Sequence, residues 1–192
     1  MLEFRRFLFP SAPAGVWSCG TVFKLFVVLF FGISGGASII VSAVLGAKNR
    51  GALSGTIGTC IVLTAIASLI IMVVATMAAR PLLELLNTPE SILDWCTSYL
   101  RILFLGAAGL AFYNILSGVL RGLGDSMSAL LYLLVASALN IVLDLLFVIK
   151  FNMGVSGVAL ATALAQGISA LLCVRRLSKL TELFDLKWKY IR

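Results

Sequence analysis

The feature that most constrains this chain is a series of long apolar segments, separated by short connectors that carry charges and turn residues. Five segments can be delimited: Leu25–Leu45, Ser54–Ala79, Ile102–Leu120, Met127–Ile149 and Val155–Val174. A helix needs about 20 mostly apolar residues to cross a hydrocarbon core about 30 Å thick. Only helices and closed barrels satisfy their backbone in lipid, and these segments lack the alternating pattern of barrel strands. The sequence therefore predicts an all-α polytopic membrane protein with five transmembrane helices.

Composition supports this class. Hydrophobic residues make up 61% of the 192 residues and charged residues 12%, against roughly half and a quarter in soluble domains. The net charge of +7 is spread over the short connectors and the tail, so it indicates membrane topology rather than nucleic-acid binding. We therefore expect a multi-pass protein of the cell membrane that contacts the lipid bilayer and no nucleic acid.

The charges of the connectors predict which ends of the helices share a side of the membrane. Lys48, Arg121 and Arg176 lie in regions expected on the cytoplasmic side, and the acidic connector around Glu90 is expected outside. Within that connector, Leu82–Leu86 is typical of a short interfacial helix. Five spans whose last one ends in the cytoplasm place the N-terminus outside. The basic residues near the N-terminus instead favour the cytoplasmic side. We therefore expect that one span of the fold is missing.

The two ends of the sequence differ from its middle. Pro10, Pro13 and several other residues interrupt any run of spanning length in residues 1–24, so we expect an atypical segment there and not a sixth packed span. Residues 25–176 are predicted to form the helical bundle. In residues 177–192, basic residues alternate with apolar and aromatic ones, which is typical of a cytoplasmic linker or an interfacial segment.

Asp144 is the residue most indicative of function, because an acid inside an apolar helix adds about 2.5 to 3.5 kcal/mol to the cost of insertion. Asn140 lies four residues earlier, on the same helical face. Such a pair can bind a hard cation through oxygen or carry a proton. Alternatively, it only joins helices by hydrogen bonds worth about 0.6 kcal/mol each. Asn114 and Thr162 offer further oxygens at membrane depth, although Thr162 lies among small residues typical of close helix packing.

Other patterns carry less functional information. Gly35, Gly36 and Ala37 are typical of a tight contact between helices. The chain has no His, and its four cysteines form no CxxC pair, so no zinc site and no cofactor are indicated. The stretch 122–125 is too short for a phosphate-binding fingerprint. We therefore expect that the chain is not an enzyme; an intramembrane protease is disfavoured because His and paired catalytic acids are lacking.

Several strings together resemble the multidrug and toxic compound extrusion (MATE) family of cation-coupled efflux transporters, over nearly all of residues 32–176. They are GISGGAS at 32–38, LGAKN at 45–49, LLNTPE at 85–90, YNILSGVLRGLGDS at 113–126, NIVLDLLFV at 140–148 and GVSGVALATALAQ at 154–166.

The resemblance implies two six-helix bundles related by pseudo-symmetry, of which this chain supplies spans two to six of the first as a partial N-terminal half. It implies that Asp144, Asn140, Thr162 and Asn114 surround a site where Na⁺ or H⁺ drives the export of small organic compounds. The family's acidic residue on the first span has no counterpart here, and residues 1–24 do not match. The second bundle would come from a missing C-terminal half or a partner chain.

Two alternatives to drug export stay open. Flippases of lipid-linked precursors in the wider superfamily share the fold, and positive charges lining the central cavity would favour flipping. The spans of this chain are nearly free of Lys and Arg, which favours drug export. A single bundle is also compatible with a non-transporting membrane module that pairs with a partner half.

Overall fold

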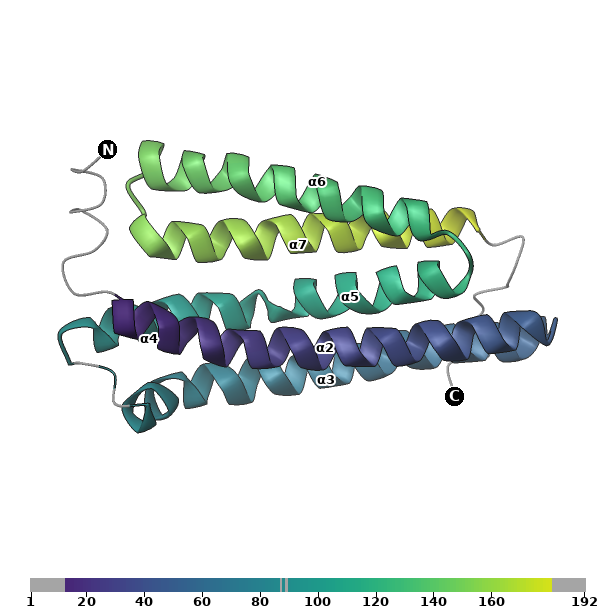
Figure 1. Cartoon of the computed structure of the whole chain (residues 1–192), viewed down its shortest axis with the longest axis horizontal. Coiled ribbons are helices and arrows are strands. Elements are labelled where there is room, and N and C mark those ends of the chain that lie inside the picture. The colour runs from purple at the N-terminus through teal and green to yellow at the C-terminus, as the bar shows by residue number, and fades with distance from the viewer. Residues whose placement is uncertain (1–12, 87, 89, 181–192) are drawn as a thin grey trace.

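The structure is a computed structural model that describes residues 13–86, 88 and 90–180. Within these residues every regular element is a helix, which confirms the predicted all-α fold. The elements, shown in Figure 1, are α2 (Pro13–Gly46), α3 (Arg50–Leu85), α4 (Glu90–Leu105), α5 (Ala107–Gly122), α6 (Ser126–Leu145), the π-helix η1 (Leu146–Lys150) and α7 (Gly154–Lys179).

The helices have the length and composition needed to cross a membrane. The segment Phe23–Gly46, α3, α6 with η1, and α7 each qualify as a span. The helices α4 and α5 qualify only together, as a pair bent by 42°. The described residues therefore contain four spans, or the predicted five when the bent pair is counted as one. The chain is a multi-pass membrane protein.

The first helix starts earlier than predicted. It begins at Pro13 and continues through Gly20 and Lys24, so the boundary expected at Leu25 lies inside α2. Proline is tolerated in the first turn of a helix because its missing N–H has no partner there. A single glycine or lysine weakens a helix without ending it. The expectation of an atypical segment over residues 1–12 lies outside the described residues.

Two other predicted boundaries are wrong. The stretch Leu82–Leu86 is the end of α3 and not a separate interfacial helix, because α3 continues through Pro81 and buries Leu83 completely. The span predicted from Ile102 is not one straight helix, because the chain bends at Gly106 between α4 and α5. A side chain at Gly106 would overlap Ala163 of α7, so the bend lies where two backbones approach closely.

Helix α5 lies at the centre of the bundle. It contacts α2, α3, α6 and α7, and nearly all of its side chains from Leu110 to Leu120 are buried. Figure 1 shows α2 and α3 as one antiparallel pair and α6 and α7 as another, with α5 between them. Among the described residues α2 and α6 make no close contact. The two pairs are therefore held together mainly through α5.

Two glycines of α5 allow its close approach to α2. A Cβ at Gly118 would lie 2.5 Å from the carbonyl oxygen of Ser34, and one at Gly122 would lie 2.7 Å from that of Ser38. Gly35, which was predicted to mediate a tight contact, has no atom within 4 Å of the position a Cβ would take, and the same is true of Gly36. The predicted contact is thus wrong for these two glycines.

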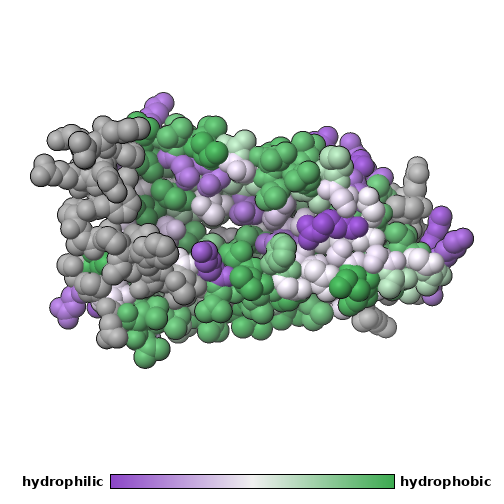
Figure 2. All heavy atoms as spheres, viewed as in Figure 1, coloured by the Kyte–Doolittle hydropathy of each residue, from purple (hydrophilic) through white to green (hydrophobic). Residues whose placement is uncertain are grey.

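The bundle has a largely apolar surface with two distinct ends. The turn that carries Lys48, the turn between α5 and α6, and the end of α7 share one end, whereas Glu90 and Lys150 lie at the other (Figure 1). Figure 2 shows hydrophobic residues over most of one face and hydrophilic residues in the band between the two helix pairs. An exposed apolar surface of this extent is expected for helices that face lipid.

Candidate functional site

Asp144 lies near the end of α6, two residues before the π-helical turn η1. Its Oδ1 is buried and has no hydrogen-bond partner among the described residues. Polar atoms that are buried in proteins nearly always have a partner, and single π-helical turns are frequent at functional sites. One oxygen of the half-buried Asp144 side chain is therefore enclosed, and none of the described residues donates a hydrogen bond to it.

Asn140 and Thr162 join α6 to α7. The Nδ2 of Asn140 donates a hydrogen bond of 3.2 Å to the Oγ1 of Thr162, which in turn donates one of 3.0 Å to the carbonyl of Val158. The antiparallel register of the two helices is continued by a bond of 3.1 Å from Ser169 Oγ to the carbonyl of Tyr132. Both predicted residues therefore meet at one level of this helix pair.

The same register relates Asp144 to its neighbours. Since Asn140 is level with Thr162, Asp144 lies one turn further along α6, level with Val158 on the first turns of α7. The carboxylate, the amide of Asn140 and the hydroxyl of Thr162 thus follow one another along a single helix–helix interface.

Asn114 takes a different role from the other predicted residues. It is buried in the middle of α5, and its Nδ2 donates to the carbonyl of Leu110 at 2.8 Å. Its own carbonyl accepts hydrogen bonds from the hydroxyls of Ser34 and Ser117. Within the described residues no hydrogen bond joins Asn114 to the α6–α7 interface. The structure therefore brings together Asn140 and Thr162, with Asp144 beside them, and keeps Asn114 within the α2–α5 contact.

Gln166 is a residue that sequence reasoning did not single out. It follows Thr162 by one helical turn on α7, and its Oε1 is buried without a hydrogen-bond partner among the described residues. The sequence does contain a sign of this residue, because a spacing of four residues places Gln166 on the same helical face as Thr162. The α6–α7 pair thus contains two buried oxygens without partners, on Asp144 and Gln166.

The sequence places Arg121 in a connector, and the residue is exposed, but its guanidinium reaches back along α5 to two buried hydroxyls. Its Nη2 donates to Ser34 Oγ at 3.0 Å and its Nη1 to Ser117 Oγ at 3.3 Å. A long arginine side chain can follow apolar surface and place its charge a full turn away from its Cα. One positive charge therefore lies at the contact between α2 and α5.

Asp125 ends the same turn and forms an ion pair with Arg176 of α7, with 2.6 Å between Oδ2 and Nε. It also caps α6 by accepting a hydrogen bond of 3.2 Å from the backbone N–H of Ser128. Burial raises the pKa of Asp125, but the hydrogen bonds from Arg176 and Ser128 together outweigh it and hold the pKa below its ordinary value. This pair fixes the ends of three helices at the connector side of the bundle.

The polar side chains of the α6–α7 interface offer oxygen atoms as ligands. Among the described residues no group of three or more His, Cys, Asp and Glu side chains comes together. A cation at this interface would instead have one carboxylate and neutral amide and hydroxyl oxygens as ligands, a set that suits hard ions and not zinc. A proton would need only the carboxylate of Asp144.

Known proteins similar to this chain are membrane transporters. Residues 9–146 match the MatE family model. The match begins at residue 9, so the expectation that residues 1–24 have no counterpart is wrong from that residue onward. Among curated relatives, the probable multidrug resistance protein YpnP of Bacillus subtilis is 48% identical over 90 residues, which are 47% of this chain and 20% of that protein. The probable multidrug resistance protein YoeA of the same organism is 30% identical over 169 residues, which are 86% of this chain and 36% of that one.

Solved structures of related transporters have the same fold. The outward-facing conformation of a multidrug resistance MATE family transporter of the MOP superfamily superposes with a TM-score of 0.89 at 27% identity, over 96% of this chain. The inward-facing conformation of such a transporter gives 0.88 at 27% identity, over 93% of this chain. In both cases the match covers 41% of the solved chain. The chain thus spans less than half the length of the proteins it matches.

Proposed function

The chain belongs to the MatE family, and from that premise we propose that it is one helical bundle of a cation-coupled antiporter that exports organic compounds. The proposed coupling ion is Na⁺ or H⁺, and the proposed substrates are small, often cationic, organic molecules. Asp144 would carry the ion together with Asn140 and Thr162 at the α6–α7 interface. Asn114 would support that site only indirectly, because its backbone carbonyl accepts the hydrogen bond from Ser34 that holds α5 against α2.

The observation that carries this proposal is the unpartnered oxygen of Asp144. A buried carboxylate oxygen without a partner costs free energy that a bound cation or proton removes. Asn140 and Thr162 lie beside it, and the amide oxygen of Asn140 stays available because only its Nδ2 is bonded to Thr162. A site of this kind changes its charge when the ion binds or leaves. That change is what a coupling site in a transporter requires.

Two tests distinguish the coupling role from a structural one. In a full-length transporter that carries this bundle, Asp144→Asn should abolish gradient-driven efflux without reducing insertion, because Asn keeps the volume and removes the charge. The matched control is Asp94→Asn on α4, whose side chain is 89% exposed and pairs with Arg80 at the surface. Unchanged resistance to drugs in Asp144→Asn cells, at normal expression, would refute a coupling role.

We also propose that the bundle needs an opposing partner to transport. Alternating access in transporters built from repeats is largely a rigid rocking of one bundle against another. The equally good superposition of this bundle on outward-facing and inward-facing relatives supports a rigid unit. The isolated 192-residue chain in liposomes, given a Na⁺ or proton gradient, should not move a fluorescent cationic substrate. Gradient-dependent uptake by this chain alone would contradict the need for a partner. A second chain could also co-purify with this one. If neither the isolated chain nor the complex of the two transports the substrate, the non-transporting module would be favoured.

One observation favours flipping of a lipid-linked precursor as the second candidate. Arg121 holds its charge at the α2–α5 contact, and among the described residues it has hydroxyl partners but no carboxylate. An anionic substrate would be attracted to such a charge. In the same full-length transporter, Arg121→Gln should leave export of a cationic dye intact if drug export is correct. Loss of activity only with an anionic, lipid-linked substrate would favour the flippase.

A further inference from the structure

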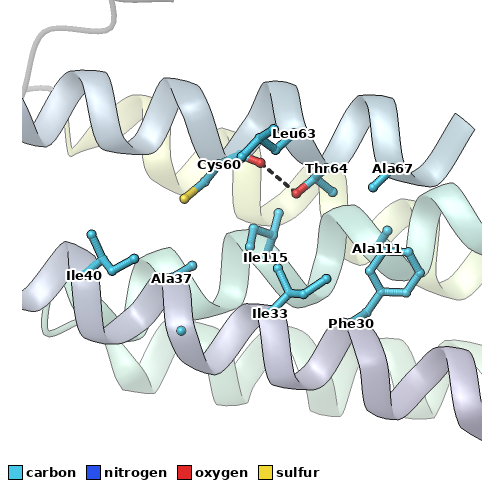
Figure 3. Close-up of a pocket in the computed structure, with 11 residues that line it drawn as sticks. Phe30, Ile33, Ala37, Ile40, Cys60, Leu63, Thr64, Ala67, Ala111 and Ile115 are labelled. Carbon is cyan, nitrogen blue, oxygen red and sulfur yellow. Dashed lines mark hydrogen bonds between the residues drawn. The ribbon is translucent and has the colours of Figure 1, made fainter. Parts of the chain in front are cut away.

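A separate apolar cavity of about 400 Å³ lies between α2 and α3. Figure 3 shows side chains of these two helices pointing toward each other across it, with α5 behind them. The rim is exposed, with Ile33 at 46%, Ile40 at 53% and Leu63 at 60% of their surface accessible. The floor is buried, with Ala37 of α2 at 5% and Ile115 of α5 at 3%. The cavity is therefore a groove that is closed behind and open outward.

The groove lies at membrane depth. Its lining on α2 runs from Phe30 to Ile40, which are sixteen and six residues from the end of the helix at Gly46. At 1.5 Å per residue, the groove extends from about 9 to about 24 Å below that end, inside a hydrocarbon core of about 30 Å. Both helices qualify as membrane spans. The open side thus lies at the depth of the lipid hydrocarbon.

The lining offers no group that would orient a polar ligand. Among the described residues that line it, the one hydroxyl is that of Thr64, which donates to the carbonyl of Cys60 at 2.7 Å, as Figure 3 shows. None of these described residues carries a charged side chain. Sites for small polar molecules contain a few placed polar groups, and water needs at least two polar partners. An organic cation and water are therefore both poor occupants, whereas a plain hydrocarbon needs no partner.

We propose that this groove holds one acyl chain of a phospholipid from the surrounding bilayer. The lining follows α2 for ten residues, about 15 Å, which suits an extended chain better than a compact ring system. Lipid tails are as apolar as the lining, so the hydrophobic effect does not drive the binding. An empty groove would lose dispersion contacts on both sides, and a chain that fills it restores them.

The test uses the 192-residue chain in vesicles of phosphatidylcholine that carries a diazirine in the middle of one acyl chain. After irradiation, mass spectrometry locates the lipid adducts. Ile33 and Leu63 line the groove, and Leu130 and Leu134 of α6 are exposed to a similar degree, at 51% and 59%, without lining it. Bound lipid should give several-fold more adducts at the groove residues, whereas a bilayer that only surrounds the protein labels all four alike.

A matched pair of variants tests the shape of the groove. A Cβ at Gly36 meets no atom within 4 Å and would enter the groove, so Gly36→Leu should fill it and reduce the groove adducts several-fold. Gly35→Leu has the same free space and does not line the groove, so it should leave them unchanged. Gly36→Ala adds a single methyl and should cause a smaller loss, which keeps the test valid if Gly36→Leu does not fold.

Several results would overturn the proposal. Equal labelling of the groove and of α6, or an equal effect of both leucine variants, would mean that no chain is held. Loss of groove adducts on addition of a cationic dye would assign the groove to an organic substrate. A loss of groove adducts that increases with protein concentration, together with cross-linked dimers, would assign the groove to a second copy of the chain. None of these results depends on whether Asp144 couples an ion.

Discussion

Asp125 and Arg176 form an ion pair that fastens the turn between α5 and α6 to the last turn of α7, with 2.6 Å between Oδ2 and Nε. The side chain of Asp125 is 16% exposed and that of Arg176 38%, so the acid is the more enclosed partner. Asp125 also caps α6 through Ser128. One carboxylate thus sets both the start of α6 and its alignment with α7.

Removing the charge of Asp125 should lower stability at neutral pH and not in acid. Because its pKa is held below the ordinary value of about 3.9, its contribution is complete above that value and is lost as the pH falls through the lowered pKa. Asp125→Asn keeps an oxygen for the helix cap and loses only the ion pair. Thermal unfolding in detergent at pH 7 should show a lower midpoint for this variant, and the difference should shrink toward zero as the pH falls through the lowered pKa. A difference that stays constant as the pH falls would mean that the ion pair does not cause it.

Gly118 should tolerate no side chain, in contrast to Gly35. A Cβ at Gly118 would lie 2.5 Å from both the carbonyl oxygen and the Oγ of Ser34, so Gly118→Ala must push α2 away from α5. We expect a loss of about 1 to 3 kcal/mol in the free energy of unfolding. Gly35→Ala, which meets nothing within 4 Å, should raise stability by up to about 1 kcal/mol because alanine favours the helix. Equal effects of the two variants in denaturant titrations would contradict the close α2–α5 contact.

These glycines also show what the sequence predicts and what it does not. The lengths of the apolar segments predict the spans, because the thickness of the bilayer alone sets that length. The acid at Asp144 stands out because its cost in lipid is large. Which glycines lie in a contact depends on the rotation of α2 against α5, and neither helix encodes that rotation by itself. Gly35 and Gly118 therefore look alike in the sequence and have opposite surroundings.

The same distinction applies to the residues at the site. Asn140 and Thr162 were expected near each other, and they share a hydrogen bond because a polar group in lipid must find a partner. Arg121 was placed in a connector because charges near segment ends normally face water. Its actual partners, Ser34 and Ser117, are polar atoms on two helices whose packing is a tertiary property.

Loss of the Thr162 hydroxyl should affect coupling far more than stability. Thr162→Val removes the acceptor of Asn140, and hydrogen bonds between membrane helices contribute about 0.6 kcal/mol on average. The unfolding free energy should therefore fall only slightly, while ion-coupled efflux in a full-length transporter that carries this bundle should drop strongly. Thr162→Ser keeps the hydroxyl and should retain activity. Thr64→Val, which removes a hydroxyl bonded only within α3, is the matched control and should leave transport unchanged.

Replacing Gln166 with leucine should raise the free energy of unfolding, whereas replacing Asn140 with leucine should lower it. The Oε1 of Gln166 is buried without a partner, and such an oxygen costs about 1 to 3 kcal/mol, so Gln166→Leu should raise the unfolding free energy by about 1 kcal/mol. Asn140→Leu removes an amide that is bonded to Thr162 and should lower it.

If the oxygen of Gln166 serves an ion or a substrate during transport, the stabilised Gln166→Leu variant should export less in the full-length transporter. A residue kept at a cost to stability is expected where activity needs it. The two measurements are thermal unfolding in detergent and efflux in cells at matched expression. A Gln166→Leu variant that is less stable than the wild type would show that the oxygen has a partner after all. One that is more stable and fully active would limit the functional site to Asp144, Asn140 and Thr162.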